Sequence, residues 1–144
     1  MDKDLKRMII LDNYQNPKNK QIPTEDGYVK INSNNVSCID NLDIYVKTEH
    51  DIIKDIKYEG EACVICISST SIITNLLIGK TIDEAKEILE NYHNMIEEKP
   101  YNKDILKDAI VYDDIYKQPS RKTCATLATR GLSKLLNETE EKIK

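Results

Sequence analysis

The chain has 144 residues, which is room for one domain, and we expect a single domain over residues 1–144. Ile, Leu and Val make up about a quarter of it, above the ~20% typical of disordered chains. Because Phe and Trp are absent, the predicted core is aliphatic with Tyr at its margins. A net charge of −4, with three Arg among 21 basic residues, argues against a nucleic-acid-binding protein.

The N-terminal half of the sequence predicts one helix and a small sheet. Apolar spacing predicts a helix over residues 3–15, and a polar loop follows as far as Gly27. Extended segments are predicted over 28–32, 42–47 and 52–58, the last two joined by turn residues. Apolar and polar residues alternate along 42–47, which indicates an antiparallel sheet with one solvated face.

The second half of the sequence predicts helices. Residues 62–79 contain no charged residue, and this length is about the shortest that could span a membrane. Their Ser, Thr and Asn side chains favour instead a buried helix over 64–78, with no membrane contact. Thr81 and Glu84 have the spacing of a capping box that begins the next helix, and a short helix is predicted near 104–110. Apolar residues with helical spacing then predict one last helix that begins at Cys124. The predicted fold is α+β, a three-stranded antiparallel sheet packed against about five helices.

The four cysteines are the first indication of function. The N-terminus shows no secretory segment, so we expect a cytoplasmic protein in which cysteines serve metal or sulfur chemistry rather than disulfides. Cys38 and Asp40 lie two residues apart, and in an extended segment they point the same way. Cys63 and Cys124 each stand at a predicted helix start, where the helix dipole favours a thiolate. Three thiols and a carboxylate are a full set of zinc ligands, although their separations match no zinc finger.

Two alternatives remain open at this point. Each Cys alone could be a small buried hydrophobic residue. Cys63 and Cys66 also form a C-x-x-C motif at a strand-to-helix junction, which is typical of thiol–disulfide oxidoreductases. Against this stand the predicted antiparallel strands and the apolar β-branched residues between the two thiols. His50 and His93 are more typical of surface or structural positions than of ligands.

Four segments of the sequence are informative together: ILDNYQNPKN, the C-x-D motif at Cys38, YEGEACVICISSTSIIT and RKTCATLATRGL. They resemble the iron–sulfur cluster assembly scaffold family, which includes the NifU N-terminal and IscU-like proteins. The likeness covers roughly residues 4–137 and is closest to the SufU-type branch, whose insertion matches residues of about 97–118. The C-terminal tail, 138–144, is expected to fray.

The resemblance implies a zinc ion held by Cys38, Asp40, Cys63 and Cys124, with Arg121 in a supporting role. It implies Cys38 as the acceptor of persulfide sulfur from a cysteine desulfurase of the SufS type. Apo iron–sulfur proteins or other assembly factors would be further partners. Whether such a protein counts as an enzyme stays open; the resemblance favours a sulfur acceptor or scaffold, a sulfurtransferase at most.

The sequence departs from the family pattern at several positions near these motifs. Ile39 and Ala62 stand where the family usually has Gly, and Cys66 stands where it usually has Ser. Thr123 replaces the His that the IscU-type branch carries before its last Cys, which favours the SufU-type function. The alternative is a scaffold on which iron and sulfide form a cluster bound by the same residues, with Cys66 as a possible extra ligand. A structural zinc domain that binds a partner is the third hypothesis.

Overall fold

The computed structural model describes residues 1–35 and 39–143, with residues 139–143 described by their backbone alone. The predicted α+β fold, with a three-stranded antiparallel sheet and about five helices, is confirmed. The elements in chain order are α1 (Lys3–Gln15), β1 (Val29–Asn34), β2 (Asn41–Glu49), β3 (Ile52–Glu61), α2 (Val64–Leu77), α3 (Ile82–Ile96), the 3₁₀ turns η1 (Lys103–Ile105), η2 (Lys107–Tyr112) and η3 (Ile115–Lys117), α4 (Pro119–Ala125) and α5 (Leu127–Ile143).

The sheet is a meander in the order β1-β2-β3, with both pairs antiparallel. Leu42, Ile44 and Val46 are buried on one face of β2, as the alternation predicts. The turn between β2 and β3 places His50 and Asp51 at φ of 51° and 67°, as a two-residue hairpin turn requires.

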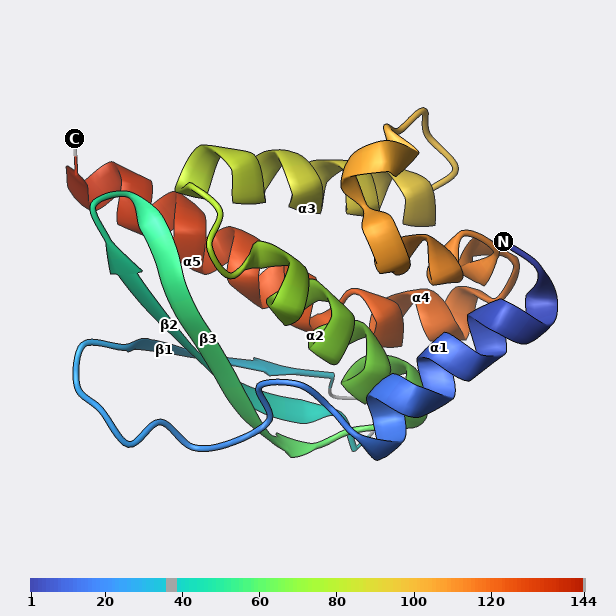
Figure 1. Ribbon diagram of the computed structural model, residues 1–144, viewed down its shortest axis with the longest axis horizontal. Coiled ribbons are helices and arrows are strands. Elements are labelled where there is room, and N and C mark those ends of the chain that lie inside the picture. The colour runs from blue at the N-terminus through green and yellow to red at the C-terminus, as the bar shows by residue number, and fades with distance from the viewer. Residues whose placement is uncertain (36–38, 144) are drawn as a thin grey trace.

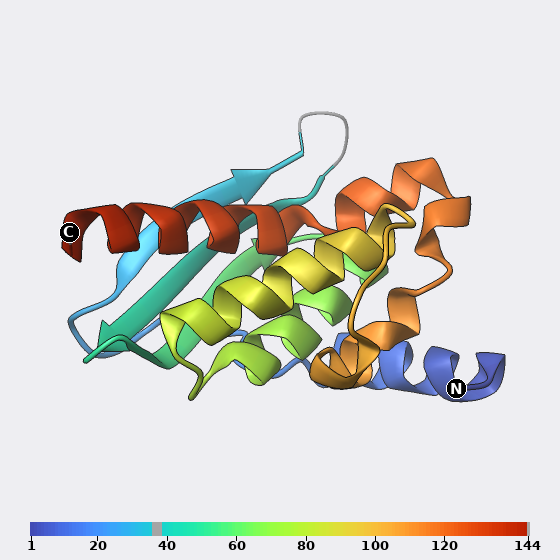
Figure 2. The ribbon, with the colours of Figure 1, turned by 90° about the horizontal axis from the view of Figure 1, so that it is seen from above.

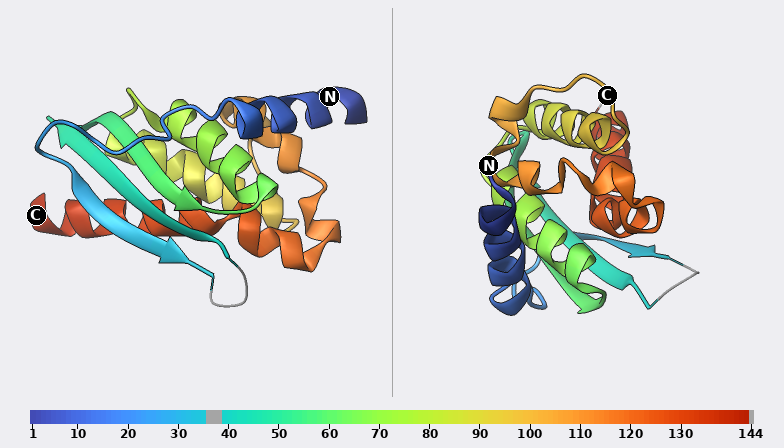
Figure 3. Two further views of the ribbon diagram at one scale, coloured as in Figure 1. Left: turned by 90° about the horizontal axis from the view of Figure 1, so that it is seen from below. Right: turned by 90° about the vertical axis from the view of Figure 1, so that its right-hand side faces the viewer.

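The helices lie against one face of this sheet. Helices α2 and α5 run across that face, α3 lies over them, and α1 packs beside α2 at the end remote from the hairpin turn (Figures 1 and 2). Figure 3 shows the opposite face of the sheet without a helix over it. Among the described residues, no helix is long and apolar enough to cross a membrane.

The core is aliphatic, as predicted, but the expectation of Tyr at its margins is wrong for three of the eight tyrosines. Tyr58, Tyr92 and Tyr112 are among the largest fully buried side chains. Two of their hydroxyls are satisfied inside the core: Tyr92 donates to the carbonyl of Ala125 at 2.8 Å, and Tyr112 shares a hydrogen bond with Ser68 at 2.6 Å. Buried tyrosines with partnered hydroxyls supply the bulk that Phe and Trp would otherwise give.

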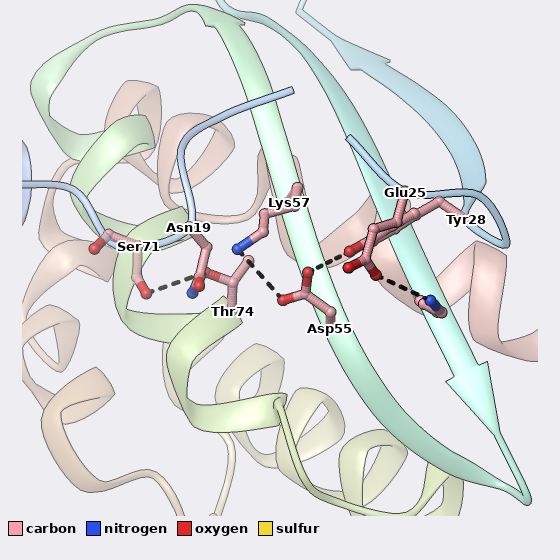
Figure 4. Close-up of polar contacts among 8 residues, drawn as sticks. Asn19, Glu25, Tyr28, Asp55, Lys57, Ser71 and Thr74 are labelled. Carbon is pink, nitrogen blue, oxygen red and sulfur yellow. Dashed lines mark hydrogen bonds and ion pairs between the residues drawn. The ribbon is translucent and has the colours of Figure 1, made fainter. Parts of the chain in front are cut away.

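The connection between α1 and β1 is fastened to the sheet and to α2 by polar contacts (Figure 4). The Tyr28 hydroxyl binds the Asp55 carboxylate, and the Asn19 side chain donates to Thr74 of α2 at 3.1 Å. Asp55 also pairs with Lys57 at 3.5 Å. These contacts hold a 13-residue polar loop in one place and tie it to the last turns of α2.

Two predicted helices differ in the structure. The apolar stripe from Cys124 to Leu136 is buried as expected, but it belongs to two helices that meet at Thr126. The Thr126 hydroxyl donates to the Lys122 carbonyl. The Arg130 guanidinium donates to the carbonyls of Thr123 and Thr126. These side-chain hydrogen bonds satisfy the last carbonyls of α4, so the helix ends there. The predicted short helix near 104–110 is a pair of 3₁₀ turns, η1 and η2.

Candidate metal centre

The pairing of β2 with β3 brings Asp40 and Cys63 together. Asn41 lies opposite Glu61, so the residue before β2 and the residues after β3 emerge side by side. Asp40 is fully buried, and its Oδ1 accepts the backbone N–H of Cys63 at 2.8 Å. Its Oδ2 lies 3.8 Å from the Cys63 Sγ. Each carboxylate oxygen therefore has a separate contact with Cys63.

Gly60 permits this close approach, and the sequence alone did not single it out. Its φ is +135°, and a Cβ built there would lie 2.1 Å from the Asn41 carbonyl oxygen. Only glycine accepts both the positive φ and the contact. A Gly at the end of a strand pattern is the available signal, because it marks a bulge or a close approach of backbones.

Cys63 is the N-cap of α2. Its backbone is extended, at φ −72° and ψ 171°, and its Sγ accepts the backbone N–H of Cys66 at 3.5 Å. The prediction that Cys63 begins a helix is therefore confirmed. Its side chain is half-buried, so it is in contact with both the core and the surface.

Cys124 reaches the same point from α4, but not from a helix start. It lies in the last turn of this seven-residue helix, so the prediction that the dipole of a helix N-terminus favours its thiolate is wrong. Burial raises the pKa of the Cys124 thiol, and hydrogen bonds with Asp40 and Cys63 raise it further. In the metal-free protein, Cys124 is therefore a protonated thiol at neutral pH.

Together these three residues form a candidate metal centre. The Sγ atoms of Cys63 and Cys124 and a carboxylate oxygen of Asp40 all lie within 4.8 Å of one another. Ligands around tetrahedral zinc are about 3.5–3.8 Å apart, given Zn–S bonds of about 2.3 Å. The donors therefore match zinc in kind and need to close by at most about 1 Å. Cys38, the fourth predicted ligand, lies outside the described residues.

A pocket of about 550 Å³ opens beside Cys63. Arg121 lines it, which places the predicted supporting residue next to the candidate centre. Ile39 and Tyr14 line the same pocket, and Ile39 is 70% exposed. The open side of the site thus combines a cation with apolar surface.

Cys66 and the two histidines stand apart from the three donors. Cys66 is fully buried, and burial together with the charges of Asp40, Cys63 and Cys124 raises the pKa of its thiol. His50 is exposed in the hairpin turn, and His93 shares a hydrogen bond with Thr129 at 2.8 Å. In the described part of the chain, neither histidine joins the metal-ligand cluster.

Comparison with known proteins decides the family. The model of the NifU-like N terminal domain matches residues 6–130. The chain belongs to the NifU-like N-terminal domain family. The resemblance to iron–sulfur cluster assembly proteins is thereby confirmed.

Both branches of the family are represented among its relatives. The chain is 34% identical to the zinc-dependent sulfurtransferase SufU of Bacillus subtilis over 131 residues, 90% of this chain and 88% of that protein. It is 32% identical to the iron–sulfur cluster assembly scaffold protein IscU of Thermotoga maritima, over 90% of each chain.

A solved structure shares the fold. The crystal structure of FiSufU from Fervidobacterium islandicum AW-1, described as a scaffold protein for iron–sulfur cluster assembly in the SUF system, superimposes with a TM-score of 0.80 at 31% identity. The match covers 86% of this chain and 90% of that one. The described sheet is an antiparallel meander and contains no βαβ unit, which a thioredoxin-like thiol–disulfide oxidoreductase would need.

Proposed function

We propose that this protein accepts sulfur from a cysteine desulfurase at a zinc site and passes it into iron–sulfur cluster assembly in the cytoplasm. The observation that carries the proposal is the convergence of Asp40, Cys63 and Cys124 from three separate elements on one point. The likeness to the zinc-dependent sulfurtransferase SufU over 90% of the chain supports it.

The proposed zinc ligands are Asp40, Cys63, Cys124 and Cys38. A bound zinc ion would lower the pKa of the coordinating thiols and hold them deprotonated. Asp40 is a harder donor than a thiolate, and its bond from the Cys63 amide fixes its orientation. Two of the thiols, those of Cys63 and Cys124, are carried by helices.

Cys38 is the proposed sulfur acceptor, as the resemblance to the SufU-type branch implies, whereas Cys63 and Cys124 are carried by helices. Its thiolate would attack the terminal sulfur of the desulfurase persulfide, and the desulfurase cysteine would leave as a thiolate. Arg121, beside Cys63 at the pocket, would attract the anionic persulfide. A desulfurase of the SufS type is the proposed donor, and apo iron–sulfur proteins are the proposed recipients.

The test is sulfur transfer from a SufS-type desulfurase supplied with cysteine, followed by intact mass and by the rate of alanine release. We expect the wild-type protein to accelerate alanine release and to gain sulfur on Cys38. Cys38→Ser should abolish both effects and keep the thermal stability of the metal-free protein. Unchanged sulfur uptake by Cys38→Ser would overturn the assignment.

A scaffold function is the second candidate, supported by the likeness to IscU of Thermotoga maritima. Iron and sulfide would then be the cargo bound by the same thiols. Anaerobic reconstitution separates the two functions. A visible cluster band that passes to an apo-ferredoxin would favour the scaffold, whereas colourless protein with about one zinc per chain would favour the sulfur acceptor.

A further inference from the structure

The C-x-x-C motif at the start of α2 brings a second thiol next to Cys63. Cys63 is the N-cap and Cys66 lies one turn later, and the backbone N–H of Cys66 points at the Cys63 Sγ across 3.5 Å. The Cys66 Sγ is only three bonds from that nitrogen. Residues one helical turn apart have Cβ atoms about 5–6 Å apart, so a small change at the helix end brings the two sulfurs to bonding distance.

The two thiols differ in access. Cys63 is half-buried and lines the open pocket, whereas Cys66 has no exposed surface. A protein or small molecule that carries sulfur can therefore reach Cys63 but not Cys66. Cys66 can react only with what Cys63 already holds.

The backbone of Cys66 is held firmly in place. The hydroxyls of Ser69 and Thr70 both donate to its carbonyl oxygen, at 3.0 and 2.7 Å. A reaction between the two sulfurs therefore involves the side chains at the first turn of α2 rather than a shift of the helix. Cys124 also lies close to Cys63, but it is carried by a separate short helix and is a proposed metal ligand.

We propose that Cys66 releases sulfur carried by Cys63 as hydrosulfide and forms a Cys63–Cys66 disulfide. This inference rests on the proposed function and adds one transfer to it: the Cys63 thiolate takes the terminal sulfur of the Cys38 persulfide, and Cys38 leaves as a thiolate. The Cys66 sulfur attacks the Sγ of a Cys63 persulfide anion; the Sγ–Sγ bond forms and the bond to the terminal sulfur breaks. The Cys66 thiol proton goes to the departing sulfur, which leaves as HS⁻. The two thiol sulfurs are oxidised and the sulfane sulfur is reduced, so no other oxidant or reductant enters the step.

This step gives the protein an activity of its own. Cluster assembly consumes sulfide, and the pair supplies the two electrons that convert sulfane sulfur to sulfide. An external dithiol must then reduce the disulfide before the next cycle. The protein would thus work as a sulfur-reducing partner as well as an acceptor.

The test loads the reduced full-length protein with inorganic polysulfide, removes the excess anaerobically, and follows hydrosulfide release and intact mass. We expect wild-type protein to release hydrosulfide and to lose two hydrogens, with Cys63 and Cys66 joined in the peptide map. Cys66→Ser should keep the added sulfur on Cys63 and release hydrosulfide at least tenfold more slowly. Cys66→Ala serves as a second variant if serine disturbs the buried position.

Ile67→Val is the matched control, since it also trims a buried side chain in the first turns of α2 and removes no thiol. It should release hydrosulfide as the wild type does. Release that is unchanged in Cys66→Ser, or a disulfide that maps to Cys63 and Cys124, overturns the inference. Loading by polysulfide needs no desulfurase, so failure of desulfurase-dependent uptake would count against the proposed function alone.

Discussion

Replacement of Gly60 by Ala tests whether the close approach of β2 and β3 builds the metal centre. The new Cβ would lie 2.1 Å from the Asn41 carbonyl oxygen, so the strands must separate by about 0.9 Å to reach even the shortest real contact. A bound metal tolerates changes of only about 0.2 Å in its ligand distances. Because Asn41 adjoins Asp40, we expect the zinc affinity to fall at least tenfold.

The stability cost can be estimated from the same geometry. A non-glycine residue at φ +135° costs on the order of 2 kcal/mol, and the strained ladder hydrogen bond adds about 1 kcal/mol. For a domain of this size, about 3 kcal/mol lowers the melting temperature by roughly 9 °C. The variant should still fold, since domains have about 5–15 kcal/mol of stability.

Gly79 provides the matched control. Its φ is +90°, but a Cβ there would meet no atom within 4 Å. Gly79→Ala should therefore show the backbone strain without the clash, with a smaller loss of melting temperature and an unchanged zinc affinity. The assays are thermal unfolding of the metal-free proteins and competition for zinc with a chromophoric chelator. If Gly60→Ala and Gly79→Ala bind zinc equally well, the argument from strand approach is refuted.

Three further predictions concern single side chains. Asp40→Asn should weaken zinc binding at least tenfold in the chelator assay. Its control, Asp43→Asn on the solvated side of β2, should leave zinc binding unchanged. Equal effects of the two variants would argue against Asp40 as a ligand. Burial, reinforced by the charge of Arg130, lowers the pKa of His93, so the stability that His93 contributes is complete above its unfolded pKa of about 6.5 and is lost as the pH falls. Urea unfolding should show a decrease in the free energy of unfolding of at most about 1.4 kcal/mol per pH unit. His93→Gln should remove this pH-dependent component. Arg130→Ala should lower the free energy of unfolding by about 1 kcal/mol, because the last carbonyls of α4 lose their donor, whereas a neutral result would show that water replaces the guanidinium.

The local patterns of the sequence predicted most of the secondary structure. The first helix, predicted over residues 3–15, has those bounds in the structure, and the capping box of Thr81 and Glu84 is present with both hydrogen bonds. These elements depend on interactions between residues close in sequence. The apolar stripe of α4 and α5 also predicted burial correctly, but it could not show the break at Thr126, which is made by the hydrogen bonds of Thr126 and Arg130.

The candidate site was predictable in part. The spacing of Cys38 and Asp40 and the helix start at Cys63 are local features, so the sequence could point to them. The position of Cys124 depends on how α4 packs against α2, and sequence spacing carries no information on that contact. The role of Gly60 was missed because Glu59, Gly60 and Glu61 resemble the end of a strand, whereas β3 continues through them and pairs with β2 as far as Asn41.

The wide separation of the donors along the chain has a consequence for folding. Asp40, Cys63 and Cys124 become neighbours only after the sheet, α2 and α4 have assembled. An ion held by all three would act as a cross-link that closes two long loops, and the unfolded chain would offer it little more than the C-x-x-C pair. Zinc at 100 times its dissociation constant would add about 2.7 kcal/mol to the free energy of unfolding. The population of folded molecules would therefore follow the supply of free zinc, which ties the amount of working protein to the metal status of its surroundings.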